Sequence, residues 1–83
     1  MKKQKDLALL LYSTTFCHLC DQAKDLLLQA SSKQQINWQQ IDISEDDSLI
    51  DKYETKIPVL LRIDNNAELN WPFTLQDIQE LII

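Results

Sequence analysis

The chain of 83 residues contains no glycine, and this absence excludes one class of site. Loops that wrap around nucleotide phosphates need glycine, because their backbone approaches the ligand too closely for a Cβ atom. A glycine-rich phosphate-binding loop is therefore excluded. Tight turns and helix ends must use Asn, Ser, Asp or Pro instead, so these residues mark the expected element boundaries.

Basic residues are also scarce. Eight Lys and Arg residues stand against 13 Asp and Glu residues, which gives a formal net charge of −5. A negative protein is repelled by phosphate backbones and by anionic lipid, so we expect neither nucleic acid nor a membrane surface as a partner. The length suits one small domain, and we expect residues 1–83 to form a single domain that is a monomer.

Long apolar runs are few. Residues 7–12 form a continuous apolar run after the charged start at residues 1–5. This run is too short for a signal peptide, and no small-residue cleavage site follows it before the cysteines. We therefore expect a cytoplasmic protein and interpret the run as a strand covered on both faces.

Cysteine is limited to Cys17 and Cys20, and their spacing carries the main functional signal. One Cys-x-x-Cys pair does not form the disulfide framework of a small secreted protein. Beside a strand-helix-strand pattern in a reducing cytoplasm, it indicates redox chemistry. The pair can also be half of a zinc site, but such sites normally have four ligands and only His18 remains. We expect no bound metal.

The pattern of residues predicts an α/β chain with the order strand, helix, strand, helix, strand, strand, helix. The expected strands are residues 7–12, 36–43, 57–63 and 68–71, and the expected helices are about residues 17–30, 44–54 and from 74 onward. The first helix is predicted from an apolar stripe with helical spacing: Leu19, Ala23, Leu26, Leu27 and Ala30.

Local signals refine these boundaries. Ser44 with Asp47, and Thr74 with Asp77, have the spacing of a capping box, which opens a helix. In the second strand the alternation of apolar residues shifts by one at residues 39–40, which predicts a bulge or the end of strand pairing. The asparagines within residues 64–67 predict a hairpin turn, because Asn tolerates the left-handed conformation.

The two cysteines are expected to have different roles. Cys17 lies at the start of the predicted helix, where unpaired N–H groups and the helix dipole favour a thiolate, so we predict that it is the nucleophile. Cys20, one turn later, is predicted to resolve the mixed disulfide. His18 either stabilises the thiolate when protonated or is a solvated residue without a role. Phe16 and Leu19 are interpreted as substrate-facing or packing residues.

Residues 12–20, Lys56-Ile57-Pro58-Val59 and the closing hairpin and helix resemble the thioredoxin fold in its minimal glutaredoxin form. More narrowly, they resemble the small glutaredoxin-like proteins of bacteria. The resemblance implies a βαβαββα order with a four-stranded mixed sheet flanked by helices. It also implies that Pro58 is cis and lies against the cysteines, and that the backbone of Ile57 pairs with an extended substrate.

The resemblance to glutaredoxins that use glutathione is incomplete. Those proteins usually carry a Lys shortly before the first Cys, where this chain has Thr14, and a Gly-Gly before the last helix, where it has Trp71-Pro72-Phe73. The N–H groups after Thr74 are still expected to bind a carboxylate. The partners implied are a disulfide-containing protein or glutathione and a thiol reductant, with no resident cofactor. The alternative is a non-catalytic binding module with idle cysteines.

Overall fold

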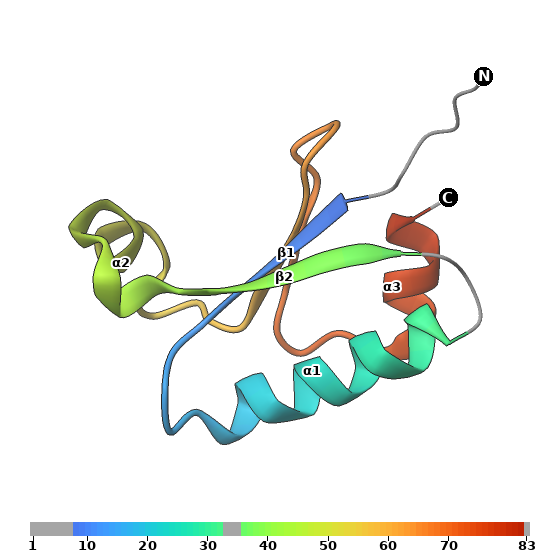
Figure 1. Ribbon diagram of the computed structural model, residues 1–83, viewed down its shortest axis with the longest axis horizontal. Helices are drawn as coiled ribbons and strands as arrows, with labels where there is room; N and C mark the ends of the chain where they lie inside the picture. Colours follow the sequence, from blue (N-terminus) through green and yellow to red (C-terminus); the bar gives the residue numbers. More distant parts are fainter. Residues whose placement is uncertain (1–7, 33–35, 83) are drawn as a thin grey trace.

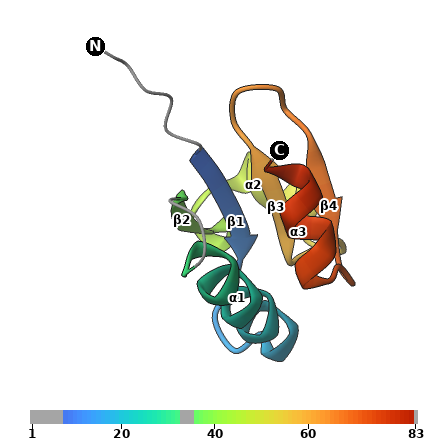
Figure 2. The same ribbon diagram turned by 90° about the vertical axis from the view of Figure 1, so that its right-hand side faces the viewer.

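The computed structural model describes residues 8–32 and 36–82. Its strands are β1 (Ala8–Ser13), β2 (Asn37–Asp42), β3 (Val59–Arg62) and β4 (Glu68–Asn70) (Figure 1). They form one sheet with the order β2-β1-β3-β4 (Figure 2). The helices are α1 (His18–Ser31), α2 (Asp47–Tyr53) and α3 (Leu75–Leu81), with a 3₁₀ turn η1 (Ile43–Glu45) before α2. The predicted α/β fold and element order are confirmed.

Two predicted boundaries fall on parts of the chain that the structure does not describe. The expected start of the first strand at Leu7 and the middle of the loop after α1, residues 33–35, lie outside the described residues. Among the residues that are described, no helix has the length and apolar character needed to cross a membrane.

Strand β1 is the centre of the sheet. It pairs in parallel with β2, from Ala8 opposite Asn37 to Ser13 opposite Asp42, and antiparallel with β3 on its other side. The sheet is therefore mixed, as expected. The continuous apolar run of β1 follows from this position, because a strand with neighbours on both edges and helices on both faces meets little water.

The two faces of the sheet carry separate apolar clusters. Helices α1 and α3 cover one face (Figure 2), where the most buried side chains are Leu9, Leu11, Leu27, Leu60 and Ile78. The other face packs beneath η1 and α2 through a smaller cluster of Tyr12, Ile43, Tyr53 and Val59. Packing on both faces of the sheet fixes the end of β1, and the loop after β1 leads directly to the cysteines.

Tyr53 fastens α2 to the sheet. Its ring stacks on Tyr12 with 4.5 Å between the centroids, and its hydroxyl donates to Glu68 Oε2 on β4 at 2.7 Å. Burial, followed by the bond to Glu68, raises the pKa of the Tyr53 phenol, so it stays protonated as the donor. Because the segment after α2 runs on into β3, this anchor also fixes the approach to Pro58.

The inward stripe of α1 differs from the prediction by one position. Leu19 is 45% exposed, whereas Cys20 is buried with Ala23, Leu27 and Ala30. At about 100° per residue, Cys20 lies about 20° from Leu27 around the helix axis, while Leu19 lies about 80° away. The prediction was wrong because it excluded the cysteine from the apolar stripe.

The start of the second helix also differs from the prediction. Ser44 does not cap a helix with Asp47. Instead Asp42 accepts hydrogen bonds from the Ser44 N–H and hydroxyl and caps η1, and Asp46 accepts from the Ser48 N–H and caps α2. Asp is as good an N-cap as Ser, and two carboxylates in suitable positions displaced the expected serine.

Strand β2 contains no bulge. Its pairing with β1 continues through Gln39 and Gln40, so the predicted interruption was wrong. Trp38 packs on the α1 and α3 side of the sheet, and Ile41 packs on the α2 side. An edge strand that places apolar residues on both faces loses strict alternation without losing its register.

The hairpin turn between β3 and β4 is confirmed. Asn66 has a φ of 60°, and the side chain of Asn65 accepts a hydrogen bond from the Ala67 N–H at 3.0 Å. The chain thus places asparagine in the left-handed region, where other proteins often have glycine.

The capping box of α3 is confirmed, and its loss should be measurable. Thr74 Oγ1 accepts from the Asp77 N–H at 3.1 Å, and Asp77 Oδ2 accepts from the Thr74 N–H at 2.9 Å. We expect Thr74→Ala to lower the free energy of unfolding in urea by about 1 kcal/mol. The control is Thr55→Ala, which alters an exposed turn; equal effects of the two substitutions would contradict the assignment.

Candidate active site

Cys17 is the N-cap of α1. Its backbone is extended, with φ −113° and ψ 104°, and its Sγ accepts a hydrogen bond from the Cys20 N–H at 3.2 Å. The Cys17 carbonyl accepts the first helical bond, from the Asp21 N–H at 3.1 Å. A sulfur in this position meets an unpaired helix N–H group and the positive end of the dipole, and both stabilise a thiolate.

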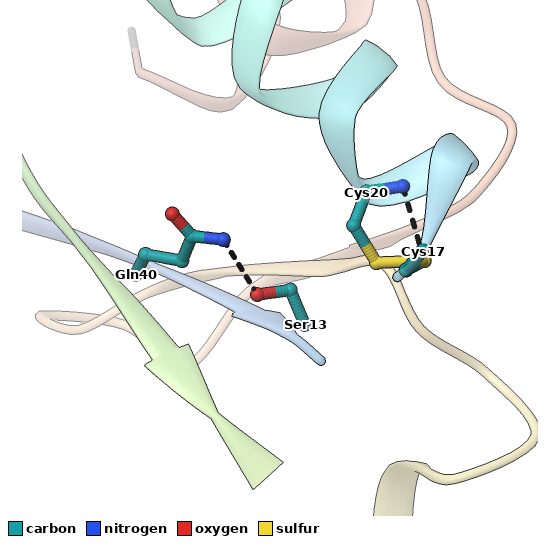
Figure 3. The surroundings of a disulfide bond; sticks show 4 residues. All are labelled: Ser13, Cys17, Cys20 and Gln40. Atoms are coloured by element: carbon teal, nitrogen blue, oxygen red, sulfur yellow. Dashed lines mark hydrogen bonds between the residues drawn. A yellow bond between two sulfur atoms is a disulfide. The ribbon is translucent and has the colours of Figure 1, made fainter. Parts of the chain in front are cut away.

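Cys17 and Cys20 form a disulfide, with 5.2 Å between their Cα atoms (Figure 3). Their exposure differs: Cys20 is only 1% exposed, whereas Cys17 is partly accessible. An external thiol or disulfide therefore reaches the pair at Cys17. Within the described parts of the chain, no three His, Cys, Asp or Glu side chains gather as metal ligands do.

Two apolar residues close to Cys17 in the sequence have exposed side chains. Phe16 is fully exposed and has a φ of 58°, and Leu19 is 45% exposed. His18, between the cysteines, is also exposed. A bulky residue in the left-handed region is uncommon and costs roughly 1 kcal/mol or more. The Phe16 backbone holds this conformation directly before Cys17, and the Phe16 side chain lies in solvent.

Ile57 and Pro58 lie just before β3, at the end of the sheet where β1 leads into the cysteine loop. Val59 pairs with Tyr12, so the residues just before β3 lie at the edge where β1 gives way to the cysteine loop. The Ile57–Pro58 bond is cis, as the resemblance implied, and Pro58 is buried. The Ile57 N–H donates to the Tyr53 carbonyl at 3.0 Å, so this N–H is already paired within the chain. The Trp71–Pro72 bond is also cis, which the sequence did not suggest.

Thr74 has a structural partner at the position where a carboxylate was expected to bind. The capping box occupies the N–H groups of Thr74 and Asp77 and places the Asp77 carboxylate at the start of α3. The binding role of Thr74 stays a prediction. A ligand carboxylate there would meet a negative charge and fewer free donors.

Sequence reasoning missed two polar residues near the disulfide. Ser13 is 1% exposed, and its Oγ accepts a hydrogen bond from Gln40 Nε2 at 2.9 Å (Figure 3). The two residues are 27 positions apart and meet only because β1 and β2 run in parallel. A buried serine at the end of a strand was the one available signal.

A pocket of about 290 Å³ opens beside the cysteine loop, and its lining residues are Ser13, Thr14, Thr15, Gln40 and Asp42. Hydrogen bonds from the Ser44 N–H, the Ser44 hydroxyl and the Thr14 hydroxyl hold the pKa of Asp42 below its usual value. The pocket therefore contains a carboxylate that is ionised at neutral pH.

The profile of the Glutaredoxin-like domain family (DUF836) matches residues 8–83. The chain belongs to this family. The Cys-x-x-Cys pair of this glutaredoxin-like chain and the cis Pro58 all lie within the matched segment. No curated protein matches the chain significantly.

Solved structures support the same fold. The chain is 34% identical to protein XcR50 from X. campestris, with a TM-score of 0.75, and the match covers 88% of this chain and 92% of that one. It is 24% identical to protein Ne2328 from Nitrosomonas europaea, with a TM-score of 0.82 over the whole of both chains. Thioredoxin 1 from Thermosipho africanus is 15% identical, with a TM-score of 0.69 and coverage of 90% and 89%, a likeness of fold alone. The fold is thioredoxin-like.

Proposed function

We propose that this glutaredoxin-like protein is a thiol-disulfide oxidoreductase that reduces or exchanges disulfides. The observation that carries the proposal is the placement of its cysteines. Cys17 caps α1, accepts a helix N–H and is accessible, whereas its partner Cys20 is buried behind it. This placement suits a redox-active pair, which needs one exposed nucleophile and one protected resolving thiol. Membership of the glutaredoxin-like family supports the same class of chemistry.

The proposed cycle has two displacements. The Cys17 thiolate attacks one sulfur of the substrate disulfide, and the other sulfur leaves with the electron pair and takes a proton from water. Cys20 then loses its proton and attacks Cys17 Sγ, so the Cys17–substrate bond breaks and the second substrate thiol is released. The substrate gains two electrons and two protons, and the Cys17–Cys20 disulfide forms. An external thiol reductant returns the enzyme to its dithiol form.

The substrate is proposed to lie across the surface made by Phe16, His18 and Leu19, with the backbone of Ile57 pairing with it beside Pro58. The exposure of Phe16 and Leu19 supports contact with apolar groups of a partner. The substrate is a disulfide-containing protein or glutathione, and we expect the protein to work as a cytoplasmic monomer. Thr74 is the candidate contact for a glutathione carboxylate.

Alkylation of the reduced protein tests the division of roles. At pH 7 we expect iodoacetamide to modify Cys17 about ten times faster than Cys20, because thiolate character and access both favour Cys17. Tandem mass spectrometry of the peptide that holds both cysteines locates the label over time. The Cys20→Ser variant gives the labelling rate of Cys17 alone, which we expect to be fast. The Cys17→Ser variant gives that of Cys20 alone, which we expect to be slow. Equal, slow labelling of both thiols would contradict the proposal.

A further inference from the structure

The pocket beside the cysteine loop is lined by residues with polar side chains. They are Ser13, Thr14, Thr15, Gln40 and Asp42, and Asp42 is the one charged residue among them. Hydroxyl, amide and carboxylate oxygens together offer acceptors to an ammonium or guanidinium group, whereas an anion would meet the Asp42 charge.

We propose that this pocket binds a Lys or Arg side chain next to the reacting cysteine of a polypeptide substrate. The inference rests on the proposed function and specifies its substrate: a protein disulfide flanked by a basic residue, in preference to free glutathione.

Asp42 retains the capacity to bind such a group. Both hydrogen bonds from Ser44 end on its Oδ1, at 2.9 Å for the N–H and 2.8 Å for the hydroxyl. The Thr14 hydroxyl donates a third hydrogen bond to this carboxylate. A carboxylate has about four acceptor positions on its two oxygens, so it can still accept hydrogen bonds from a cation. The cap that Asp42 forms on η1 also fixes the side chain before a ligand arrives, which lowers the entropy cost of binding.

The pocket lies within reach of the reacting sulfur. Thr15, in its lining, is two residues before Cys17, a separation of at most about 7 Å along the backbone. A substrate joined to Cys17 through its own cysteine holds the adjacent residues over this loop. A long Lys or Arg side chain from one of them can then enter the pocket.

The surroundings of the pocket complement the same kind of substrate. Residues 42–56 contain six Asp and Glu residues and two Lys, an excess of four negative charges. Asp42 lies opposite Ser13, and Val59 lies opposite Tyr12, both at the end of β1. The acidic segment therefore begins and ends at the same end of the sheet as the cysteine loop (Figure 1). The field favours approach by a basic polypeptide and opposes glutathione, which carries two carboxylates and one ammonium group.

Three matched peptides test the proposal on the Cys20→Ser variant, which stops after the first attack. Each is Ala-Xaa-Cys-Xaa-Ala with blocked ends, and its cysteine is a mixed disulfide with 5-thio-2-nitrobenzoate; Xaa is Arg, Met or Glu. Attack by Cys17 on the peptide sulfur releases thionitrobenzoate, which is followed at 412 nm. We expect the Arg peptide to react about fivefold faster than the Met peptide, with the Glu peptide slowest, and the preference to shrink in 0.5 M NaCl.

A second substitution localises the preference to the pocket. Asp42→Asn keeps a capping oxygen but removes the charge, and we expect the ratio of Arg to Met rates to fall close to one. Asp51→Asn removes an equal charge from the exposed surface of α2 and should keep most of the ratio. Circular dichroism checks that both variants fold. An Arg to Met ratio unchanged by Asp42→Asn would overturn the proposal.

The remaining outcomes separate this inference from the function on which it rests. If all three peptides react with Cys17 equally fast, the pocket proposal fails while the proposed function stands. If the same mixed disulfide of glutathione reacts faster than the Arg peptide, the substrate preference is overturned in favour of glutathione. If Cys17 reacts with none of them, the proposed function and the pocket proposal both fail.

Discussion

Replacing Cys17 by Ser is expected to abolish disulfide exchange, while Cys20→Ser is expected to preserve the first attack and stop the cycle at the mixed disulfide. Serine at position 17 has no thiolate, and the buried Cys20, only 1% exposed, cannot meet a substrate in its place. Serine at position 20 still donates its backbone N–H to Cys17 Sγ, so the nucleophile keeps its stabilising bond.

Turnover and trapping measure these two results separately. Reduction of a model disulfide by the enzyme with excess dithiothreitol reports turnover, which should fall to background with Cys17→Ser. Mass spectrometry of Cys20→Ser after exposure to the oxidised substrate should show one bound substrate thiol per protein. Cys17→Ser should keep the unfolding midpoint of the reduced parent within a few degrees, because the side chain is partly accessible and loses little volume. Cys20→Ser should lower the midpoint by several degrees, because it places a hydroxyl at a site that is 1% exposed. Activity in Cys17→Ser combined with inactivity in Cys20→Ser would reverse the assigned roles.

Replacing Leu27 by Ala is expected to lower the free energy of unfolding by about 2–5 kcal/mol. Leu27 is 0% exposed and lies in the cluster between α1 and the sheet. Its loss removes apolar contacts and leaves a cavity that the neighbouring side chains fill only in part. Small domains are stable by about 5–15 kcal/mol, so this one substitution is expected to remove a large share of the stability.

The adjacent residue provides the control. Leu28 has the same side chain on the same helix but is 49% exposed, so Leu28→Ala should change the free energy of unfolding by about 0.5 kcal/mol or less. Urea unfolding followed by circular dichroism measures both variants under one condition. Similar losses in the two variants would contradict the assigned inward face of α1.

Local rules predicted well where the partners are close in sequence. Thr74 and Asp77 form the expected capping box, and Asn66 takes the left-handed turn position. Each feature depends on residues within one turn of the chain. The same kind of rule was wrong at Ser44, because Asp42 and Asp46 were equally suitable caps and spacing alone did not rank them.

The candidate site also has one part that depends on neighbouring residues in the sequence and one part that depends on the fold. The Cys17–Cys20 pair and its place at a helix start were read from a motif of four residues. The pocket beside it depends on the parallel register that brings Asp42 and Gln40 to the end of β1, and no local pattern contains that register. The cysteine pair and its position at a helix start could be predicted from one motif, whereas the neighbouring pocket could be recognised only from the fold.

The most direct test of the central claim is the reduction potential of the Cys17–Cys20 pair. The protein is equilibrated with mixtures of reduced and oxidised dithiothreitol or glutathione at pH 7, and its free thiols are trapped and counted by mass. We predict a midpoint between about −120 and −270 mV, the range of dithiols that exchange electrons with substrates. A midpoint below about −300 mV would instead indicate a static structural disulfide and contradict the proposed oxidoreductase.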